Sequence, residues 1–223
     1  MVYSAPEHHP AFEEYCETIF ELAEDNLSVI QARIAERLEV SRPAVSGMTK
    51  RLEQEGLVTT SGNEIRLTDD GTELAQSVVR RHRLAERFLT DILGLNWTDA
   101  HHEAGKWEHV ISPAVERKLD ELLGSPTTCP HGNPIPGSEY EQPETSTLSD
   151  MAVGTPFVVS RIPEELEFEP GLLEFLEQSS LTPGTEGTVT ASSPDGTITV
   201  SIDDQHIGVG SFASDRILVS SRT

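Results

Sequence analysis

The spacing of apolar residues along the first part of the chain predicts three helices. Over residues 11–25, apolar side chains recur every three or four positions, as on the buried face of an amphipathic helix. The same spacing predicts helices over residues 28–38 and 43–56. The third helix would have Ser41 as its N-cap and Pro43 in its first turn, where the missing N–H costs nothing.

Two strand-like runs follow, LVTT and EIRLT, joined by the turn-forming residues Ser61-Gly62-Asn63. Three helices and a two-stranded hairpin predict a winged helix-turn-helix domain over residues 1–74. In such domains the second helix of the motif enters the major groove of DNA. The alternative is a three-helix packing unit with no role in DNA binding. The predicted DNA contacts are Arg33, Ser41, Arg42, Pro43, Ser46, Thr49 and Lys50.

The rest of the chain predicts a helical middle region and a β-rich C-terminal region. Helical segments are expected through residues 75–125, the first of them running on to Leu93. Residues 126–147 are rich in Pro, Gly, Ser and Thr and are typical of a linker. Over residues 148–223, short β runs separated by Gly, Pro and Asp predict a small β-barrel interrupted by one helical turn. The predicted fold class is therefore mainly α with a β C-terminal domain.

The sequence predicts a cytoplasmic protein with no membrane partner. No run of about 18 apolar residues, the length of a membrane span, occurs in it. Its N-terminus lacks the basic stretch and apolar core of a signal peptide. Cys16 and Cys129 make no disulfide framework, which favours a reducing compartment.

The net charge complicates the prediction of DNA binding. Asp and Glu outnumber Lys and Arg by 38 to 16, so the formal net charge is −22 and would normally repel phosphate. In molar salt, however, the Debye length falls to about 3 Å, and only residues in contact still matter. An acidic surface with so few lysines is typical of a halophilic, salt-accumulating cytoplasm; an acidic interaction surface is the alternative. The net charge therefore does not exclude DNA.

Histidines and carboxylates gather in residues 80–109, next to four arginines. Three sets share predicted helix faces: His82 with Glu86; His101 with Gly105, Glu108 and His109; and Glu14 with Glu17. Imidazoles and carboxylates that converge between helices suit a divalent transition metal of intermediate hardness. The alternative is a set of solvated acids and surface histidines in an acid-rich protein.

Four segments, ARIAERLEVSRPAVS, HRLAERFLTDILGL, WEHVISPAVERKL and GNPIPG, resemble the iron- and manganese-dependent repressors of the diphtheria toxin repressor family. The resemblance extends over almost the whole chain. It implies a winged helix, a helical metal-binding and dimerisation domain, a linker and an SH3-like domain. It further implies a homodimer, not an enzyme, that binds a palindromic double-stranded DNA operator when loaded with Fe²⁺ or Mn²⁺. Zn²⁺ and other divalent ions would replace these metals in vitro.

The resemblance also implies two metal sites. The ancillary site would consist of His82, Glu86 and His101, completed from the SH3-like domain by Glu164 and Glu167. In the manganese-type branch a Cys-Pro-His motif adds ligands, and here these residues are Cys129 and His131. The primary site would include the four positions Glu14, Gly105, Glu108 and His109.

Two positions depart from the family pattern. Gly105 has no side chain to offer, so a backbone carbonyl, water, Glu17 or His102 would have to replace the usual ligand. Gly47 stands where the family often has a base-reading Gln, so Ser41, Pro43, Ser46 or neighbouring residues would read the bases. The oxygen ligands of the primary site favour Mn²⁺ or Fe²⁺. At the ancillary site, a Cys129 ligand would favour Fe²⁺ or Zn²⁺. The alternative is that Cys129 is only a small buried residue and binds no metal.

Two further groups follow from the predicted middle helices. Arg80, Arg81, Arg83 and Arg87 either support the ligands beside them or pair with acids on neighbouring helices. The apolar residues expected at the dimer interface are Leu89, Ile92 and Leu93.

Three other functions compete with the repressor hypothesis. A metal-dependent hydrolase is disfavoured because HEAGK does not match HExxH and a winged helix would be unexplained. A metal buffer with a vestigial DNA-binding head is favoured by the acidic surface and by Gly47. An activator of the same fold is left open.

Overall fold

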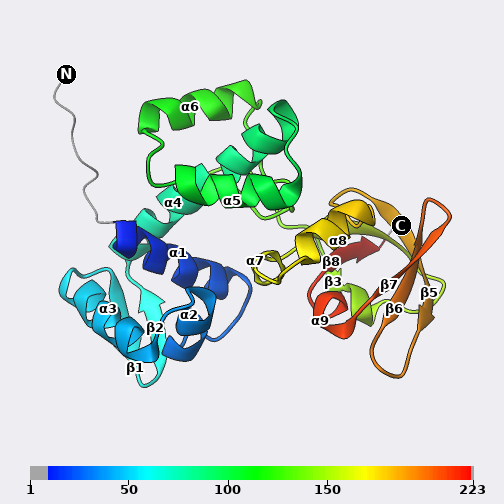
Figure 1. Cartoon of the computed structure of the whole chain (residues 1–223), viewed down its shortest axis with the longest axis horizontal. Helices are drawn as coiled ribbons and strands as arrows, with labels where there is room; N and C mark the ends of the chain where they lie inside the picture. Colours follow the sequence, from blue (N-terminus) through cyan, green and yellow to red (C-terminus); the bar gives the residue numbers. More distant parts are fainter. Residues whose placement is uncertain (1–9, 222–223) are drawn as a thin grey trace.

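The computed structural model of the chain describes residues 10–221. Figure 1 shows a head of three helices and a hairpin, a group of helices next to it, and a β-rich C-terminal domain. The short helix α7 (Glu164–Glu167) lies where these three regions approach one another (Figure 1). Within the described residues, no helix is both long and apolar enough to cross a membrane.

The head has the predicted winged helix-turn-helix architecture. Its elements are α1 (Pro10–Glu24), α2 (Gln31–Arg37), α3 (Arg42–Gln54), β1 (Val58–Ser61) and β2 (Glu64–Leu67). Ser41 caps α3, because its hydroxyl accepts a hydrogen bond from the backbone N–H of Ala44 at 3.3 Å. The strands pair antiparallel, and one apolar core joins them to all three helices.

The junction between the hairpin and α4 (Asp69–Arg87) has no room for a side chain at Gly71. A Cβ atom there would lie 1.9 Å from the carbonyl oxygen of Leu57. We expect Gly71→Ala to lower the free energy of unfolding by at least about 2 kcal/mol, since backbone must shift to admit the methyl group. Urea denaturation measures this loss. Gly47→Ala is the matched control: no described atom lies within 4 Å of its Cβ position, so an undiminished stability is expected there.

The middle region consists of α4, a π-helical segment at Phe88–Ile92, α5 (Trp97–Trp107) and α6 (Pro113–Leu122). The helix predicted to reach Leu93 therefore changes its hydrogen-bond pattern after Arg87. Leu89 is 2% exposed and packs inside this region, so its assignment to a dimer interface was wrong. Ile92 and Leu93 are each 53% exposed and stay candidates for that interface.

The C-terminal domain is a six-stranded antiparallel sheet in the order β3-β8-β4-β5-β6-β7, wrapped around a large apolar core. Its strands are β3 (Ser146–Thr147), β4 (Pro156–Arg161), β5 (Glu186–Ser192), β6 (Ile198–Ile202), β7 (Gln205–Val209) and β8 (Leu218–Ser221). Its helical segments are a 3₁₀ turn (Leu148–Asp150), α7, α8 (Leu172–Gln178) and α9 (Ser211–Ser214). The single predicted helical turn is thus α8, which has seven residues.

The predicted linker contains a folded loop. Cys129, His131 and Asn133 are at most 1% exposed, and the backbone N–H of Cys129 donates to the carbonyl oxygen of Asn133 at 2.9 Å. Gly132 has φ +88°, a conformation that favours glycine. Composition alone predicts a linker. The polar side chains of this loop are instead buried against α4 and the C-terminal domain.

Candidate metal centre and DNA-binding surface

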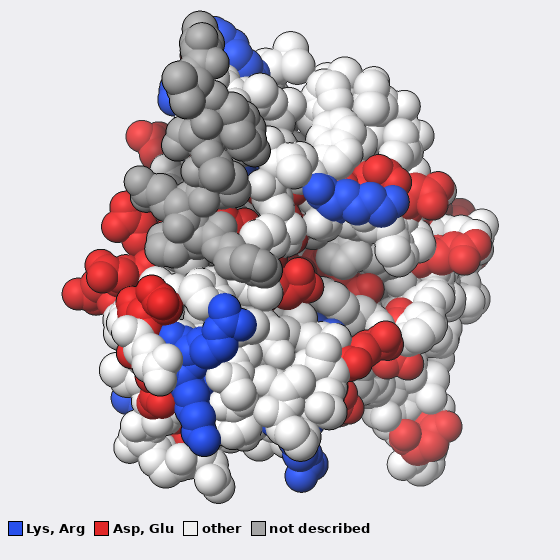
Figure 2. All heavy atoms as spheres, turned by 60° about the vertical axis from the view of Figure 1, so that its left-hand side comes forward, with Lys and Arg blue, Asp and Glu red and all other residues white. Residues whose placement is uncertain are grey.

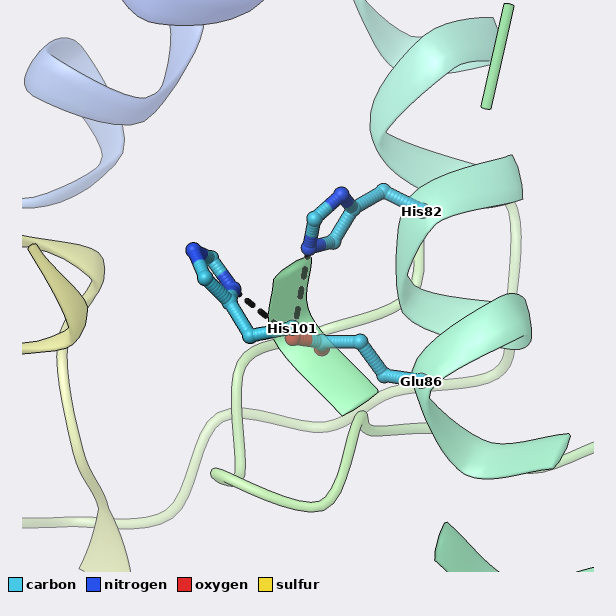
Figure 3. A group of neighbouring side chains, drawn as sticks. All are labelled: His82, Glu86 and His101. Carbon is cyan, nitrogen blue, oxygen red and sulfur yellow. Dashed lines mark hydrogen bonds and ion pairs between the residues drawn. The ribbon is translucent and has the colours of Figure 1, made fainter. Parts of the chain in front are cut away.

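Glu86 is at the centre of a buried group of imidazoles. Its Oε1 atom lies 3.2 Å from Nε2 of His82, one turn earlier on α4, and 3.0 Å from Nδ1 of His101 on α5. Figure 3 shows both rings directed toward this carboxylate. One ligand atom from each residue lies within 4.8 Å of the other two, so a single ion could bind all three.

A second group shares Glu86 and adds the folded loop. Glu86, Cys129 and His131 also offer ligand atoms within 4.8 Å of one another. Glu167 of α7 lies beside both groups, with Oε2 at 2.9 Å from Nδ1 of His131 and 3.2 Å from Nδ1 of His101. The carboxylates of Glu86 and Glu167 therefore connect the middle helices, the loop and the C-terminal domain.

Several buried polar atoms at this centre make no hydrogen bond of good geometry with the described residues, although some of them lie in ion-pair contact. They are Nε2 of His82, Oε2 of Glu86, both ring nitrogens of His131 and Oε2 of Glu167. Unsatisfied groups in a protein interior are costly, and a site with several of them calls for an explanation. A divalent cation would use such lone pairs as ligands, so the residues fit a metal.

The electrostatics of the centre follow from the close packing of imidazoles and carboxylates away from water. Burial alone would lower the pKa of His101, but hydrogen bonds to Glu167 and Glu86 raise it to about 10. Burial would raise the pKa of Glu167, but the neighbouring imidazoles of His131 and His101 lower it to about 2. Carboxylates that stay ionised in a buried site need cations close by, here protons on the histidines or a metal in their place. Burial raises the pKa of the Cys129 thiol well above its usual value.

A third group joins the head to the middle region. Glu17 of α1 approaches His82 and Glu108, again with ligand atoms within 4.8 Å of one another. His82 faces both ways, since its Nδ1 atom lies 2.5 Å from Oε2 of Glu108 while its Nε2 atom faces Glu86. Arg81 fixes this end of α5 by donating a hydrogen bond to the carbonyl oxygen of Glu108 at 2.8 Å.

The other residues expected at the primary site form a looser arrangement. His109 lies 3.2 Å from Glu108, but its Nε2 atom is 3.7 Å from the half-exposed carboxylate of Glu14. Its Nδ1 atom bonds instead to Glu13 at 2.7 Å, a buried residue that the sequence did not single out. No described atom lies within 4 Å of a Cβ built on Gly105, which lines a cleft of about 600 Å³.

Glu164, predicted for the ancillary site, pairs with an arginine through one carboxylate oxygen, while its buried Oε2 atom has no hydrogen-bond partner among the described residues. Its Oε1 atom lies 2.8 Å from Nη2 of Arg83, which is fully buried and also binds Glu24 at 2.7 Å. The structure therefore pairs Glu164 with an arginine, because the guanidinium neutralises it directly. The predicted pairing of arginines with acids on neighbouring helices extends to Arg80, which lies 3.1 Å from Glu116 on α6.

The candidate DNA-binding surface lies on α3 and the hairpin. Ser41, Arg42, Pro43 and Lys50 are exposed and Ser46 is half-buried. Of these, Arg42, Ser46 and Lys50 line a groove between α3 and the hairpin. Figure 2 shows this side of the molecule with scattered basic side chains, acids and much uncharged surface.

Two predicted DNA contacts are less accessible. Thr49 is 3% exposed and its hydroxyl donates to the carbonyl oxygen of Val45, so it packs within the head and its predicted contact with DNA is disfavoured. Arg33 is half-buried on α2.

The winged head and the buried histidine–carboxylate centre define a metal-responsive DNA-binding protein. Residues 9–64 match the iron dependent repressor N-terminal DNA binding domain, residues 68–137 its metal binding and dimerisation domain, and residues 146–221 the FeoA domain. The chain belongs to the family of iron-dependent repressors. The family, the fold and the class of function predicted from the sequence are thereby confirmed: the protein is a metal-dependent transcriptional repressor.

Relatives in two groups support this assignment. The iron-dependent repressor IdeR of Mycobacterium leprae is 39% identical over 202 residues, covering 85% of this chain and 87% of that protein. The diphtheria toxin repressor of Corynebacterium diphtheriae is 50% identical over 126 residues, 56% of each chain. A solved manganese-dependent transcriptional repressor in complex with manganese has a TM-score of 0.85 and 32% identity, covering 95% of this chain and all of that one. The structure of ScaR with bound Zn²⁺ has a TM-score of 0.77 and 29% identity, covering 95% of this chain and 99% of that one.

Proposed function

We propose that this protein is a cytoplasmic, homodimeric repressor of metal-uptake genes that binds a palindromic operator when Mn²⁺ or Fe²⁺ is bound. One observation carries the proposal: Glu86 and His82 link three candidate ligand groups drawn from the head, the middle helices and the folded loop, and Glu167 of the C-terminal domain lies beside them. A ligand set that spans all three regions makes their relative positions depend on metal.

In this mechanism His82, Glu86, His101, His131 and Glu167 hold the metal, and Glu17 and Glu108 hold a second ion or support the first. The bound metal supplies the positive charge that the converging carboxylates lack. Glu17 then keeps α1 of the head close to α5. Metal promotes DNA binding only because the ligands approach one another more closely in the DNA-binding arrangement than in other arrangements.

The dimer presents two copies of α3 to DNA. We propose that Ile92 and Leu93 contribute to the interface, since both are half-exposed apolar residues on the middle region. Two α3 helices would then meet half-sites about 34 Å apart, one helical turn of DNA, or a multiple of that distance. Ser41, Pro43 and Ser46 would face the bases, while Arg33, Arg42 and Lys50 would contact phosphates.

The ligand chemistry favours Mn²⁺ or Fe²⁺. Carboxylate oxygens and imidazole nitrogens outnumber the single thiol, and these donors suit the harder divalent metals. Cys129 is fully buried, and its raised pKa makes the thiolate a costly ligand. Zn²⁺ also accepts imidazole and carboxylate ligands, so it would compete for the same residues in vitro.

The experiment that tests the function is DNA binding at matched free metal. Fluorescence anisotropy with fragments from upstream of its own gene and of neighbouring metal-transport genes would compare anaerobic Fe²⁺, Mn²⁺ and a chelator in molar KCl. We expect tight binding that chelation abolishes. Lys50→Ala should weaken DNA binding and leave metal binding unchanged. Metal binding without DNA binding to any fragment would favour a metal buffer instead.

Metal binding should release protons at pH 7. In the metal-free protein the carboxylates of Glu167 and Glu86 raise the pKa of His101 to about 10, so this ring carries a proton at neutral pH, and neighbouring carboxylates also raise the pKa of His82 and of His131. A metal takes neutral imidazole, so affinity should increase with pH as these protons become easier to remove. Titration calorimetry in two buffers of different ionisation enthalpy gives the number released; equal heats in both would contradict the ligand assignment.

A further inference from the structure

The residues of α7 and the following Phe168 each contact a different part of the molecule. Glu164 binds Arg83 of α4, and Glu167 lies beside His101 and His131 at the metal centre. The backbone N–H of Glu165 donates to Asp25, just after α1, at 3.1 Å. This short segment of the C-terminal domain is therefore in contact with both other regions.

Phe168 contacts the helix-turn-helix of the head. The guanidinium carbon of Arg37 on α2 lies 3.9 Å from the centre of the Phe168 ring, a cation–π arrangement. Phe168 also contacts the metal centre. The centroid of its ring lies 5.4 Å from that of the His101 ring, and the two ring planes are at 89° to each other. One aromatic ring thus touches a candidate metal ligand and the DNA-binding head.

Arg37 has few other partners among the described residues. Its side chain is 6% exposed, and Nη1 and Nη2 have no hydrogen-bond partner among the described residues. The nearest carboxylate oxygen in an ion pair, on Glu21, is 3.7 Å away. A desolvated guanidinium with so few partners gains more from an aromatic face than an exposed one does.

We propose that Phe168 is a positioning residue that transmits metal occupancy to α2 through its stack on Arg37. Phe168 follows the candidate ligand Glu167 directly, so the placement of that carboxylate on a metal sets the placement of the ring. α2 packs against α3, the helix that faces DNA. This route leads from the C-terminal domain to the DNA-binding helices without passing along α4. The inference rests on the proposed metal-dependent DNA binding.

The measurable quantity is the coupling between metal and DNA, the factor by which metal tightens DNA binding. By linkage, DNA tightens metal binding by the same factor. Phe168→Ala should reduce the coupling factor about three- to thirtyfold, the range that a cation–π contact represents. Mn²⁺ affinity without DNA should change much less, because the metal ligands all stay in place.

The experiment measures Mn²⁺ affinity by calorimetry with and without operator DNA, and DNA affinity with Mn²⁺ and with chelator. Phe168→Tyr should keep wild-type coupling, since it keeps the aromatic face, while Phe168→Leu should lose it although it keeps an apolar side chain. Phe175→Ala is the matched control, a partly exposed Phe of the same domain on α8. Thermal unfolding identifies any variant that is misfolded. In that case Arg37→Lys is tested instead of the misfolded variant, because it keeps the positive charge but not the planar guanidinium.

The outcomes separate this inference from the proposed function. Lost coupling in Phe168→Ala and Phe168→Leu, with Phe168→Tyr and Phe175→Ala unchanged, supports the inference. Wild-type coupling in Phe168→Leu overturns it and leaves the proposed function intact. A wild-type protein whose DNA affinity is the same with Mn²⁺ and with chelator overturns the proposed function itself.

Discussion

Glu86→Gln should abolish metal-dependent DNA binding. Glu86 is 1% exposed, and its Oε1 atom lies 3.2 Å from His82, 3.0 Å from His101 and 3.5 Å from His131. Changing a group that only supports a metal ligand costs 10–100-fold in affinity, so removing a charge shared by two ligand groups should cost more than about 100-fold. Calorimetry with Mn²⁺ measures the loss, and anisotropy with operator DNA reports its functional effect.

Glu103→Gln is the matched control for this change. Glu103 is a carboxylate of the neighbouring helix α5, but it is half-exposed and pairs only with Lys106 at 2.6 Å among the described residues. Wild-type metal affinity is expected. If Glu86→Gln also bound Mn²⁺ with wild-type affinity and stoichiometry, the metal would have to bind elsewhere, with Glu17, His82 and Glu108 as the remaining candidate group.

Arg83→Met should destabilise the protein by about 3–5 kcal/mol, the usual effect of removing one partner from a buried ion pair. The Arg83 side chain is fully buried, and its guanidinium binds Glu24 and Glu164 as well as the carbonyl oxygen of Pro134. Without it, the buried carboxylate of Glu164 has no arginine beside it, whereas Glu24 keeps its ion pair with Arg161 at 3.1 Å. Urea denaturation measures the change in the free energy of unfolding.

A second substitution distinguishes the lost charge pair from lost packing. Adding Glu164→Gln to Arg83→Met removes the uncompensated buried charge and should recover part of the stability. Arg66→Met is the surface control, since Arg66 is 69% exposed in its pair with Glu64, and a change below about 1 kcal/mol is expected. A loss below about 1 kcal/mol for Arg83→Met would mean that Glu164 is not neutralised by this arginine.

The parts of the fold that depend on local sequence could be predicted. Apolar spacing of three and four residues located α1 to α3, and Ser41 with Pro43 located the start of α3. The pair His82 and Glu86 was predictable for the same reason, because residues four apart on a helix share a face. These inferences need no knowledge of how distant elements pack.

The parts that depend on tertiary contacts could not be predicted. Glu164 and Glu167 look alike in sequence, and only the position of α7 decides that one meets Arg83 and the other meets His131. Likewise, a small rotation of α1 decides that Glu13 is the carboxylate closer to His109 than Glu14. A helical periodicity fixes a face to within one residue, which is too coarse to choose between neighbours.

The segment 126–147 illustrates a limit of composition as a guide. Its Pro and Gly content is typical of a tether, yet Asn133 donates hydrogen bonds to Glu167 at 2.7 Å and to the carbonyl oxygen of Ile162 at 3.0 Å. Gly and Pro here shape a tight loop whose polar groups find partners in the C-terminal domain. Turn-forming residues therefore indicate a change of chain direction, and say little about exposure.

The folded loop also determines how proteolysis would divide the molecule. Proteases cut where backbone is exposed and free of regular structure, and residues 141–144 meet both conditions while residues 129–133 are buried. Cleavage within residues 141–144 would leave Cys129 and His131 on the N-terminal fragment and Glu167 on the C-terminal fragment. A protein truncated at this point would keep its DNA-binding head and most of its metal ligands, yet it would no longer connect the metal to the C-terminal domain.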